Sequence, residues 1–385
     1  MDRDAAIKFM LEALKAMLKR GGSDLFVTAG FPVAAKIDGK MTPLSDQPLE
    51  AKQTQMLARA IMNDRQVKEF DASKECNFAI NPPNIGRFRV NAFIQQGRTG
   101  MVLRTITTDI PDFERLGLPP VLRDVVMEKT GLVLVVGGTG SGKSTTLAAM
   151  LGHRNKNSHG HIITIEDPVE YVHPHINCII TQREVGVDTE SWHAALKNTL
   201  RQAPNVILIG EIRDHETMEH AINFAETGHL ALSTLHANNA NQALDRIINM
   251  FPPDKRQQLL MDLSLNLKGI VSQRLLRKKS GGRVAAIEIL LNSPLIKDLI
   301  FKGDVHSIKE VMGRSEELGM KTFDSALFDL HEADLITYEE AMRSADSPNE
   351  LRLRIKLKGK GAKDKNLDDG LGGLGLVAKE EDVSM

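Results

Sequence analysis

One lysine lies in glycine-rich surroundings of the kind that hold a charged phosphate. The stretch VVGGTGSGKSTT, residues 135–146, contains the spacing Gly-x4-Gly-Lys-Ser, in which Lys143 is followed by Ser144. Glycines let successive backbone N–H groups turn toward phosphate oxygens, and the lysine adds a positive charge. The apolar run LVLVV precedes this loop and the helical pattern STTLAAML follows it. We therefore predict a binding site for a nucleoside triphosphate, formed by Gly137, Gly138, Thr139, Gly140, Ser141, Gly142, Lys143, Ser144 and Thr145.

Hydrolysis of a bound triphosphate also needs carboxylates, which hold a metal ion and activate water. The apolar run NVILIG ends just before Glu211, and the run IITI ends before Glu166, Asp167 and Glu170. Ser144 and Glu211 are the predicted ligands of Mg²⁺. Three carboxylates so close together would repel each other, and a bound cation would relieve that repulsion. Either Glu166 or Glu170 is the predicted general base, and the sequence leaves this choice open.

Two histidines bracket the predicted strand LALSTL, His229 before it and His236 after it. Residues seven positions apart on a straight strand face opposite sides, so the two imidazoles should not share one task. His236, just past the end of the strand, is the predicted sensor of the γ-phosphate. For His229 a structural and a functional role both stay open.

Four arginines cluster in the N-terminal part of the chain, on the segment GRFRVNAFIQQGRTGMVLRTI, which predicts a β-hairpin: Arg87, Arg89, Arg98 and Arg104. Single surface arginines are common, but four on one hairpin could reach phosphates bound at the loop. They could do so from the same chain or from a neighbouring one. An arginine supplied in trans stabilises transition-state charge and would make ring assembly a condition of catalysis.

The apolar pattern predicts an α/β fold. From Val121 onward, short runs that are apolar on both faces alternate with helical stretches, as in a parallel sheet with buried strands. From Asp254 to Lys358 we expect mostly helices, with one strand at RVAAIEILL. The predicted organisation is an α/β module at 1–105, a hinge-like linker at 106–120, a P-loop core at 121–290, a helical region at 291–357 and a disordered tail at 358–385.

Composition and charge argue against several classes of protein. The formal net charge of the 385 residues is −1 and aromatics make up 4%, which disfavours a nucleic-acid partner, because such partners favour basic stripes and aromatic stacking platforms. The two cysteines, Cys76 and Cys178, lie in no zinc-like spacing and are typical of reduced thiols in a cytosolic protein. No apolar run approaches the roughly 18 residues of a membrane span, so we expect no direct membrane insertion.

Taken together, these motifs resemble the secretion-type ATPases of bacterial type IV pili, in particular the retraction ATPases PilT and PilU. The resemblance rests on several stretches in the right order and covers residues 1–354: SDLFVTAGFP, GRFRVNAF, GGTGSGKSTT, TIEDPVEY, ILIGEIRD, ETGHLALSTLHA and SQRLL. It implies a PAS-like N-terminal domain, a RecA-like C-terminal domain and a homo-hexameric ring that hydrolyses ATP with Mg²⁺. It also implies that an inner-membrane platform protein is the partner on which the ring acts, in the cytoplasm and peripheral to that membrane.

The resemblance assigns roles to residues at matching positions. Lys143 and Ser144 match the Walker A pair, Glu211 the Walker B acid, and His229 and His236 the histidine box of the family. Arg89 and Arg104 match the N-terminal arginines that reach the γ-phosphate.

Three departures favour PilU over PilT: Phe26 in place of the usual histidine, PLIKDLI at 294–300 in place of AIRNLI, and a longer tail. PilU-type proteins commonly act beside a PilT paralogue, so that paralogue is an expected partner. Two other functions stay open, namely a non-catalytic, nucleotide-gated partner of PilT and a RecA-type nucleic-acid motor. Fold alone does not choose among them.

Overall fold

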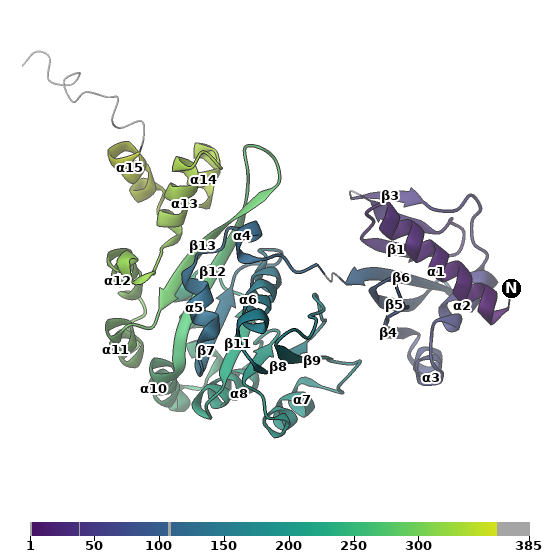
Figure 1. Ribbon diagram of the computed structural model, residues 1–385, viewed down its shortest axis with the longest axis horizontal. Helices are drawn as coiled ribbons and strands as arrows, with labels where there is room; N and C mark the ends of the chain where they lie inside the picture. Colours follow the sequence, from purple (N-terminus) through teal and green to yellow (C-terminus); the bar gives the residue numbers. More distant parts are fainter. Residues whose placement is uncertain (1, 38, 107–108, 360–385) are drawn as a thin grey trace, which may run out of the picture.

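The computed structural model describes residues 2–37, 39–106 and 109–359. Two β-sheets organise this part of the chain, one formed before residue 107 and one after residue 108. Figure 1 shows them as separate layered bodies joined by a single chain segment.

Six antiparallel strands form the first sheet in the described part of the chain, in the order β3-β2-β1-β6-β5-β4. These strands are β1 (Asp24–Val27), β2 (Ala34–Ile37), β3 (Lys40–Pro43), β4 (Glu75–Ile80), β5 (Arg87–Gln95) and β6 (Arg98–Ile106). The helices that accompany them are α1 (Arg3–Lys19), α2 (Ala51–Ala60) and α3 (Asp64–Ser73). Met10 and Leu14 of α1 and Leu57 of α2 share one apolar core with Leu25 and Leu103 of the sheet.

The predicted hairpin of β5 and β6 is confirmed. The two strands pair along their whole length, and the turn between them places Gln96 and Gly97 at positive φ, of 48° and 72°. Glycine adopts this backbone conformation without strain, which explains the turn at this point of the sequence. The register sets Arg89 directly opposite Arg104, so both side chains lie on one face of the sheet.

The second sheet has seven strands among the described residues, in the order β13-β12-β7-β11-β10-β8-β9. They are β7 (Gly131–Val136), β8 (Gly160–Glu166), β9 (Cys178–Glu184), β10 (Val206–Ile209), β11 (Leu230–Leu235), β12 (Leu267–Arg277) and β13 (Arg283–Leu291). All neighbours pair in parallel except β12 and β13. The four apolar runs predicted as buried parallel strands are β7, β8, β10 and β11, so the predicted α/β class is confirmed.

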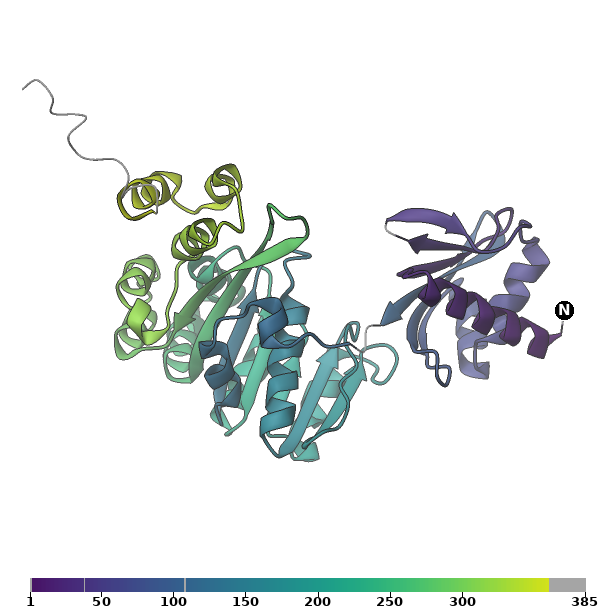
Figure 2. The same cartoon turned by 45° about the horizontal axis from the view of Figure 1, so that its top comes forward.

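Helices cover both faces of this sheet (Figure 2). Along β7, Leu132, Leu134 and Val136 enter the core shared with α8, α9 and α10, whereas Val133 and Val135 enter the core shared with α5 and α6. The helices of this body before residue 267 are α4 (Phe113–Leu116), α5 (Val121–Met127), α6 (Lys143–Asn157), α7 (Trp192–Thr199), α8 (His215–Glu226), α9 (Ala240–Met250) and α10 (Arg256–Asn266), with the short 3₁₀ helices η1 (Leu200–Gln202) and η2 (Pro253–Lys255). Parallel strands bring their carboxyl ends to one edge, so the loops there lie close together.

The C-terminal region is helical, as predicted, and forms a smaller core of its own. Its helices are α11 (Pro294–Lys302), α12 (Ile308–Arg314), α13 (Phe323–Glu332), α14 (Tyr338–Ser344) and α15 (Pro348–Lys358), with η3 (Glu316–Leu318) between α12 and α13. Phe323 and Leu327 of α13 pack there against Leu276 of β12 and Ala286 of β13. The tail predicted as disordered falls, from residue 360 on, outside the described residues.

One expectation about these elements was wrong. The region after Asp254 contains a second long strand, β12, which lies between β7 and β13 inside the sheet. The hinge-like linker at 106–120 stays a prediction; in its second half Asp112 caps α4, and the buried Phe113 and Leu118 pack with α5 and α6. Gly117 there ends α4 at φ 63°.

In the described part of the chain, none of the helices combines the length and the apolar character that crossing a bilayer demands.

Candidate nucleotide site

The predicted phosphate loop connects β7 to α6 at the carboxyl edge of the second sheet. Two of its glycines are tightly enclosed: a Cβ on Gly137 would lie 2.6 Å from the carbonyl oxygen of Gln273, and one on Gly142 would lie 2.7 Å from Nε2 of Gln273. The Oγ atom of Ser141 is buried without a hydrogen-bond partner among the described residues. A narrow cradle, an unpaired polar atom and the N-terminus of α6 fit an anionic phosphate.

Lys143 is the first residue of α6 and points back over the loop. Its Nζ atom donates hydrogen bonds to the carbonyl oxygens of Gly137, at 2.9 Å, and Gly138, at 3.0 Å. Burial lowers the pKa of Lys143, and the nearby carboxylate of Glu211 partly offsets this effect. The ammonium group of Lys143 is thus held at the loop, within electrostatic range of the carboxylate of Glu211.

Glu166 and Glu170 both line the cavity beside the loop, but their surroundings differ. Glu166 is the last residue of β8 and accepts hydrogen bonds from Thr164 Oγ1, at 2.6 Å, and Gln182 Nε2, at 3.3 Å. Burial raises the pKa of Glu166 to about 7. Glu170 is exposed and follows the cis peptide bond between Asp167 and Pro168. A general base works best with a pKa near the operating pH, so the structure favours Glu166 for that role.

Glu211 follows β10 and lies at the centre of a charged group. Its Oε2 atom accepts a hydrogen bond from Arg213 at 3.0 Å, and its Oε1 atom lies 3.2 Å from Nε2 of His236. His236 follows β11, so two adjacent strand ends bring the pair together. The carbonyl oxygen of His236 accepts a hydrogen bond from Arg246 of α9 at 2.9 Å, which holds the histidine's backbone in place.

These side chains share one cavity of about 520 Å³. Its walls come from the ends of β7, β8, β10 and β11, where the sheet topology gathers their loops. The predicted site residues that line it are Thr139, Gly140, Gly142, Lys143, Ser144, Thr145, Glu166, Glu170, Glu211 and His236. The hydroxyl of Ser144 and the carboxylate of Glu211 are oxygen donors, the ligand type that Mg²⁺ prefers.

The structure does not bring His229 into this cavity. His229 precedes β11, and its backbone carbonyl accepts a hydrogen bond from Gly131 at the start of β7. A strand of this length spans roughly 20 Å, so His229 lies at the opposite edge of the sheet from the loop after β7. Its Nδ1 atom lies 3.2 Å from the carbonyl oxygen of Phe224 and 3.2 Å from Thr227 Oγ1. The two histidines thus lie beyond opposite ends of β11, a separation that differs from the opposite faces of the strand expected from their spacing.

The N-terminal arginines also lie outside the lining of this cavity. Arg104 donates from Nε to the buried carboxylate of Asp24 at 2.6 Å, while 68% of its side chain is exposed. The hydrogen bond to Asp24 raises the pKa of Arg104, and Glu170 adds a smaller electrostatic effect in the same direction. The charge of Arg89 acts on Glu184 of β9. Arg104 and Arg89 thus lie within electrostatic range of Glu170 and Glu184 respectively, but neither lines the cavity of its own chain.

Sequence reasoning missed three residues that build the site. The hydroxyls of Tyr171 and Thr145 lie 2.9 Å apart, and Gln273 accepts a hydrogen bond from Thr146 Oγ1 at 2.7 Å. The single tryptophan, Trp192, lines the cavity. Tyr171 and Gln273 lie inside the TIEDPVEY and SQRLL stretches, so their positions could have been found from those motifs.

Comparison with known proteins agrees with this geometry. Residues 1–315 match the family described as Type II/IV secretion system protein. The type IV pilus ATPase PilU of Pseudomonas aeruginosa is 56% identical over 96% of this chain and 97% of its own length. The retraction ATPase PilT of the same organism is 43% identical over 88% of this chain and 98% of its own. A crystal structure of the pilus retraction motor PilT with bound ADP superposes with a TM-score of 0.84, at 41% identity over 89% of this chain and 99% of that one.

The fold and the site therefore define a P-loop ATPase, and the chain belongs to the Type II/IV secretion system protein family. Within that family it is a pilus ATPase of the PilT and PilU type, more similar to PilU than to PilT.

Proposed function

We propose that this chain is an ATP-driven motor of the type IV pilus machine, which drives or assists pilus retraction and twitching motility. One observation carries the proposal. A phosphate loop, Glu166, Glu211 and His236 converge on one cavity, in a chain that is 56% identical to PilU over 96% of its length.

The residues divide the chemistry among themselves. The loop and Lys143 bind the phosphates, and the carboxylate of Glu166 accepts a proton from the attacking water. Ser144 and Glu211 would hold Mg²⁺, which supplies charge neutralisation at the phosphate oxygens when bound. His236, 3.2 Å from Glu211, senses the terminal phosphate through that carboxylate.

We further propose that the working form is a homo-hexamer in which Arg89 and Arg104 complete the site of a neighbouring copy. Support comes from their placement, because both arginines lie together on one face of the hairpin, outside the lining of their own chain's cavity. An arginine inserted across an interface stabilises transition-state charge and links hydrolysis to assembly. The expected partners are a PilT paralogue and the inner-membrane platform protein, with the ring in the cytoplasm at that membrane.

Genetics in the source organism tests this function. The gene and its PilT paralogue would be deleted singly and together, and each strain would be complemented with the wild-type chain or with Lys143→Ala. Twitching and surface piliation are the measurements. We expect the wild-type chain to restore twitching in the strain that retains the paralogue, and Lys143→Ala to fail.

Full restoration by Lys143→Ala would favour the non-catalytic partner instead. Two results together would contradict a role in retraction. The strain that lacks only this gene would twitch normally, and the double deletion would show no greater defect than the strain that lacks only the paralogue.

A further inference from the structure

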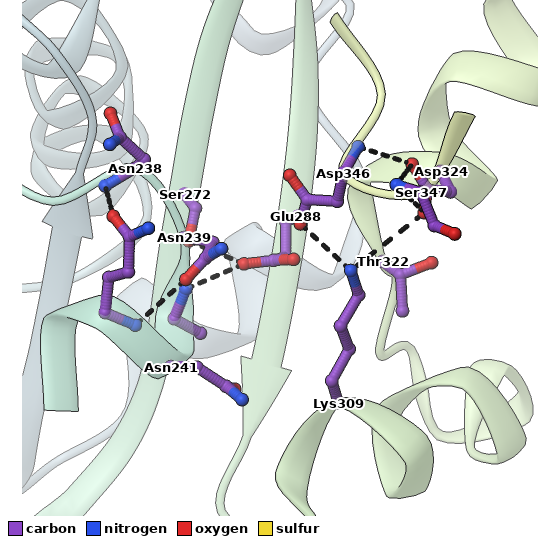
Figure 3. Close-up of polar contacts among 12 residues, drawn as sticks. Asn238, Asn239, Asn241, Ser272, Glu288, Lys309, Thr322, Asp324, Asp346 and Ser347 are labelled. Atoms are coloured by element: carbon purple, nitrogen blue, oxygen red, sulfur yellow. Dashed lines mark hydrogen bonds and ion pairs between the residues drawn. The ribbon is translucent and has the colours of Figure 1, made fainter. Parts of the chain in front are cut away.

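The segment that follows β11 carries His236 and leads into α9 at Ala240. Its backbone is fixed at two neighbouring positions by charged side chains of β12 and β13. Figure 3 shows this region, from the asparagines at the start of α9 to the helices of the C-terminal region.

Glu288 of β13 makes the first attachment. Its side chain is buried, and its Oε1 atom accepts hydrogen bonds from the backbone N–H of Ala240, at 2.8 Å, and from Ser272 Oγ, at 3.0 Å. Asn239 caps the same helix end by accepting a hydrogen bond from the N–H of Gln242 at 2.9 Å. The first turn of α9 is thus fixed to the interior of the sheet (Figure 3).

Arg274 of β12 makes the second attachment, and it reaches in two directions. Nη2 donates to the carbonyl oxygen of Asn238 at 3.2 Å, two residues beyond His236. The same guanidinium donates to the carbonyl oxygen of Ser344 and to Oδ1 of Asp346, both at 2.6 Å. It also stacks on the ring of Phe323 at 3.9 Å. One side chain therefore joins the His236 segment to the end of α14 and to α13.

The C-terminal end of this connection is itself braced. Lys309 of α12 lies 3.1 Å from Oδ2 of Asp346, and Asp324 of α13 accepts the backbone N–H groups of Asp346, at 2.8 Å, and Ser347, at 3.1 Å. Figure 3 shows Lys309 between the two aspartates. A movement of α12 or α13 would therefore move Asp346 and, through Arg274, the carbonyl of Asn238.

We propose that Arg274 is a positioning residue for ATP hydrolysis: it ties the C-terminal helices to the His236–Asn238 segment, so that the arrangement of those helices sets the rate of turnover. Arg274 does not line the nucleotide cavity. It acts by fixing the segment whose histidine meets Glu211. A displacement of about 1 Å at a reacting group can lower a rate by about a hundredfold, so a modest shift of this segment is enough. The inference concerns hydrolysis by the full chain and does not depend on pilus retraction.

The test is steady-state ATP hydrolysis by full-length Arg274→Ala and Arg274→Lys, with wild type and Arg343→Ala as references. Arg343 is the matched control, because it lies in the same region on α14, with a largely exposed side chain paired to Glu340. We expect Arg274→Ala to lower kcat about tenfold while KM for ATP changes less than about twofold. Arg274→Lys should not restore kcat, because an ammonium group lacks the planar fork that serves three acceptors at once. Arg343→Ala should match wild type.

A double-mutant cycle with His236 separates positioning from a general structural role. If Arg274 acts through His236, Arg274→Ala combined with His236→Ala should lower kcat no further than His236→Ala alone. Two results would overturn the proposal. One is a double variant whose loss of kcat equals the product of the losses in the two single variants, and the other is a kcat within about twofold of wild type in Arg274→Ala.

Arg274→Ala leaves Asp346 without one of its partners and could fail to fold for that reason. The double variant Arg274→Met with Asp346→Asn then replaces it, since it removes both charges of the pair. It is judged by the same two measurements, its kcat and its kcat when combined with His236→Ala. Wild-type hydrolysis that depends on Lys143 shows that the enzyme is active, so a negative result for Arg274 leaves the proposed function intact.

Discussion

The Nε2 atom of His236 lies 3.2 Å from the Oε1 atom of Glu211, although the two residues follow different strands and are separated by an entire helix. Glu211 also acts electrostatically on Lys143, which covers the phosphate loop. The carboxylate thus connects the phosphate-binding lysine to the segment after β11. We therefore expect a change in charge at the loop to act, through Glu211, on the segment that Arg274 joins to the C-terminal helices.

Replacing Lys143 with alanine should abolish hydrolysis. The substitution removes the only lysine or arginine side chain in the lining of the described cavity, and with it the charge that faces the phosphates. We expect turnover at least about a hundredfold lower in a phosphate-release assay with Mg²⁺ and ATP. Unchanged turnover would remove Lys143 from the mechanism.

Replacing Arg104 with alanine should lower turnover while nucleotide binding largely persists. An arginine that acts across a subunit interface contributes mainly in the transition state, so a loss of about a hundredfold or more in kcat is expected. Binding of a fluorescent ADP analogue and phosphate release are the two measurements. Arg98→Ala, at the far end of the same hairpin, is the matched control.

The ion pair with Asp24 needs its own control, because Asp24 is buried and loses its partner in Arg104→Ala. Adding Asp24→Asn removes that unpaired charge. A variant that loses binding but keeps its rate at saturating ATP would indicate ground-state recognition instead.

The pH dependence of turnover should identify the general base. Burial raises the pKa of Glu166 to about 7, and a base must be deprotonated to accept a proton. We therefore expect kcat to rise with pH between about 6 and 8, and Glu166→Gln to lower kcat by about a hundredfold. Glu170→Gln serves as the matched comparison from the same cavity and should keep most of the activity. The reverse pattern would assign the role to Glu170.

Glu288 should make the folded chain less stable as pH rises. Burial raises its pKa from 4.5 to about 7, so the folded state binds the proton more tightly than the unfolded state does. That contribution to the free energy of unfolding is complete below about pH 4.5 and is lost as pH rises through about 7.

The measurement is Tm between pH 5 and 8 for wild type and Glu288→Gln, which keeps an oxygen to accept the N–H of Ala240. Between pH 5 and 8, Tm should fall less in Glu288→Gln than in wild type. The difference between the two falls should be about 2–4 °C for each kcal/mol that ionisation of Glu288 takes from the free energy of unfolding of wild type. Glu166 contributes in the same direction, so Glu166→Gln is measured beside it. Parallel curves for wild type and Glu288→Gln would contradict the assignment.

Local patterns were sufficient to predict the loop and the central strands. The spacing of Gly137, Gly142 and Lys143 is complete within eight residues, and the runs of β7, β8, β10 and β11 are apolar because both of their faces are buried. The strand β12 was missed because its buried Ser272 and Gln273 are polar, with partners on β13 and α6. These two polar residues interrupt the apolar residues of β12, Ile270 and Val271 before them and Leu275 and Leu276 after them, so the strand does not read as one continuous apolar run.

Long-range contacts account for the rest of what the sequence left open. The choice between Glu166 and Glu170 depends on burial and on Gln182 of β9, sixteen residues away. The role of Arg274 depends on acceptors that lie up to 72 residues along the chain. No spacing rule relates such positions, since the fold alone brings them together.

The central claim is that a triphosphate held by the phosphate loop is completed by arginines of the N-terminal hairpin. A structure of the assembled protein with Mg²⁺ and a non-hydrolysable ATP analogue tests it most directly. The account predicts the guanidinium of Arg89 or Arg104 from an adjacent copy within hydrogen-bond distance of the γ-phosphate, and Lys143 on the same phosphate. Both arginines remaining far from the γ-phosphate in every subunit would contradict it.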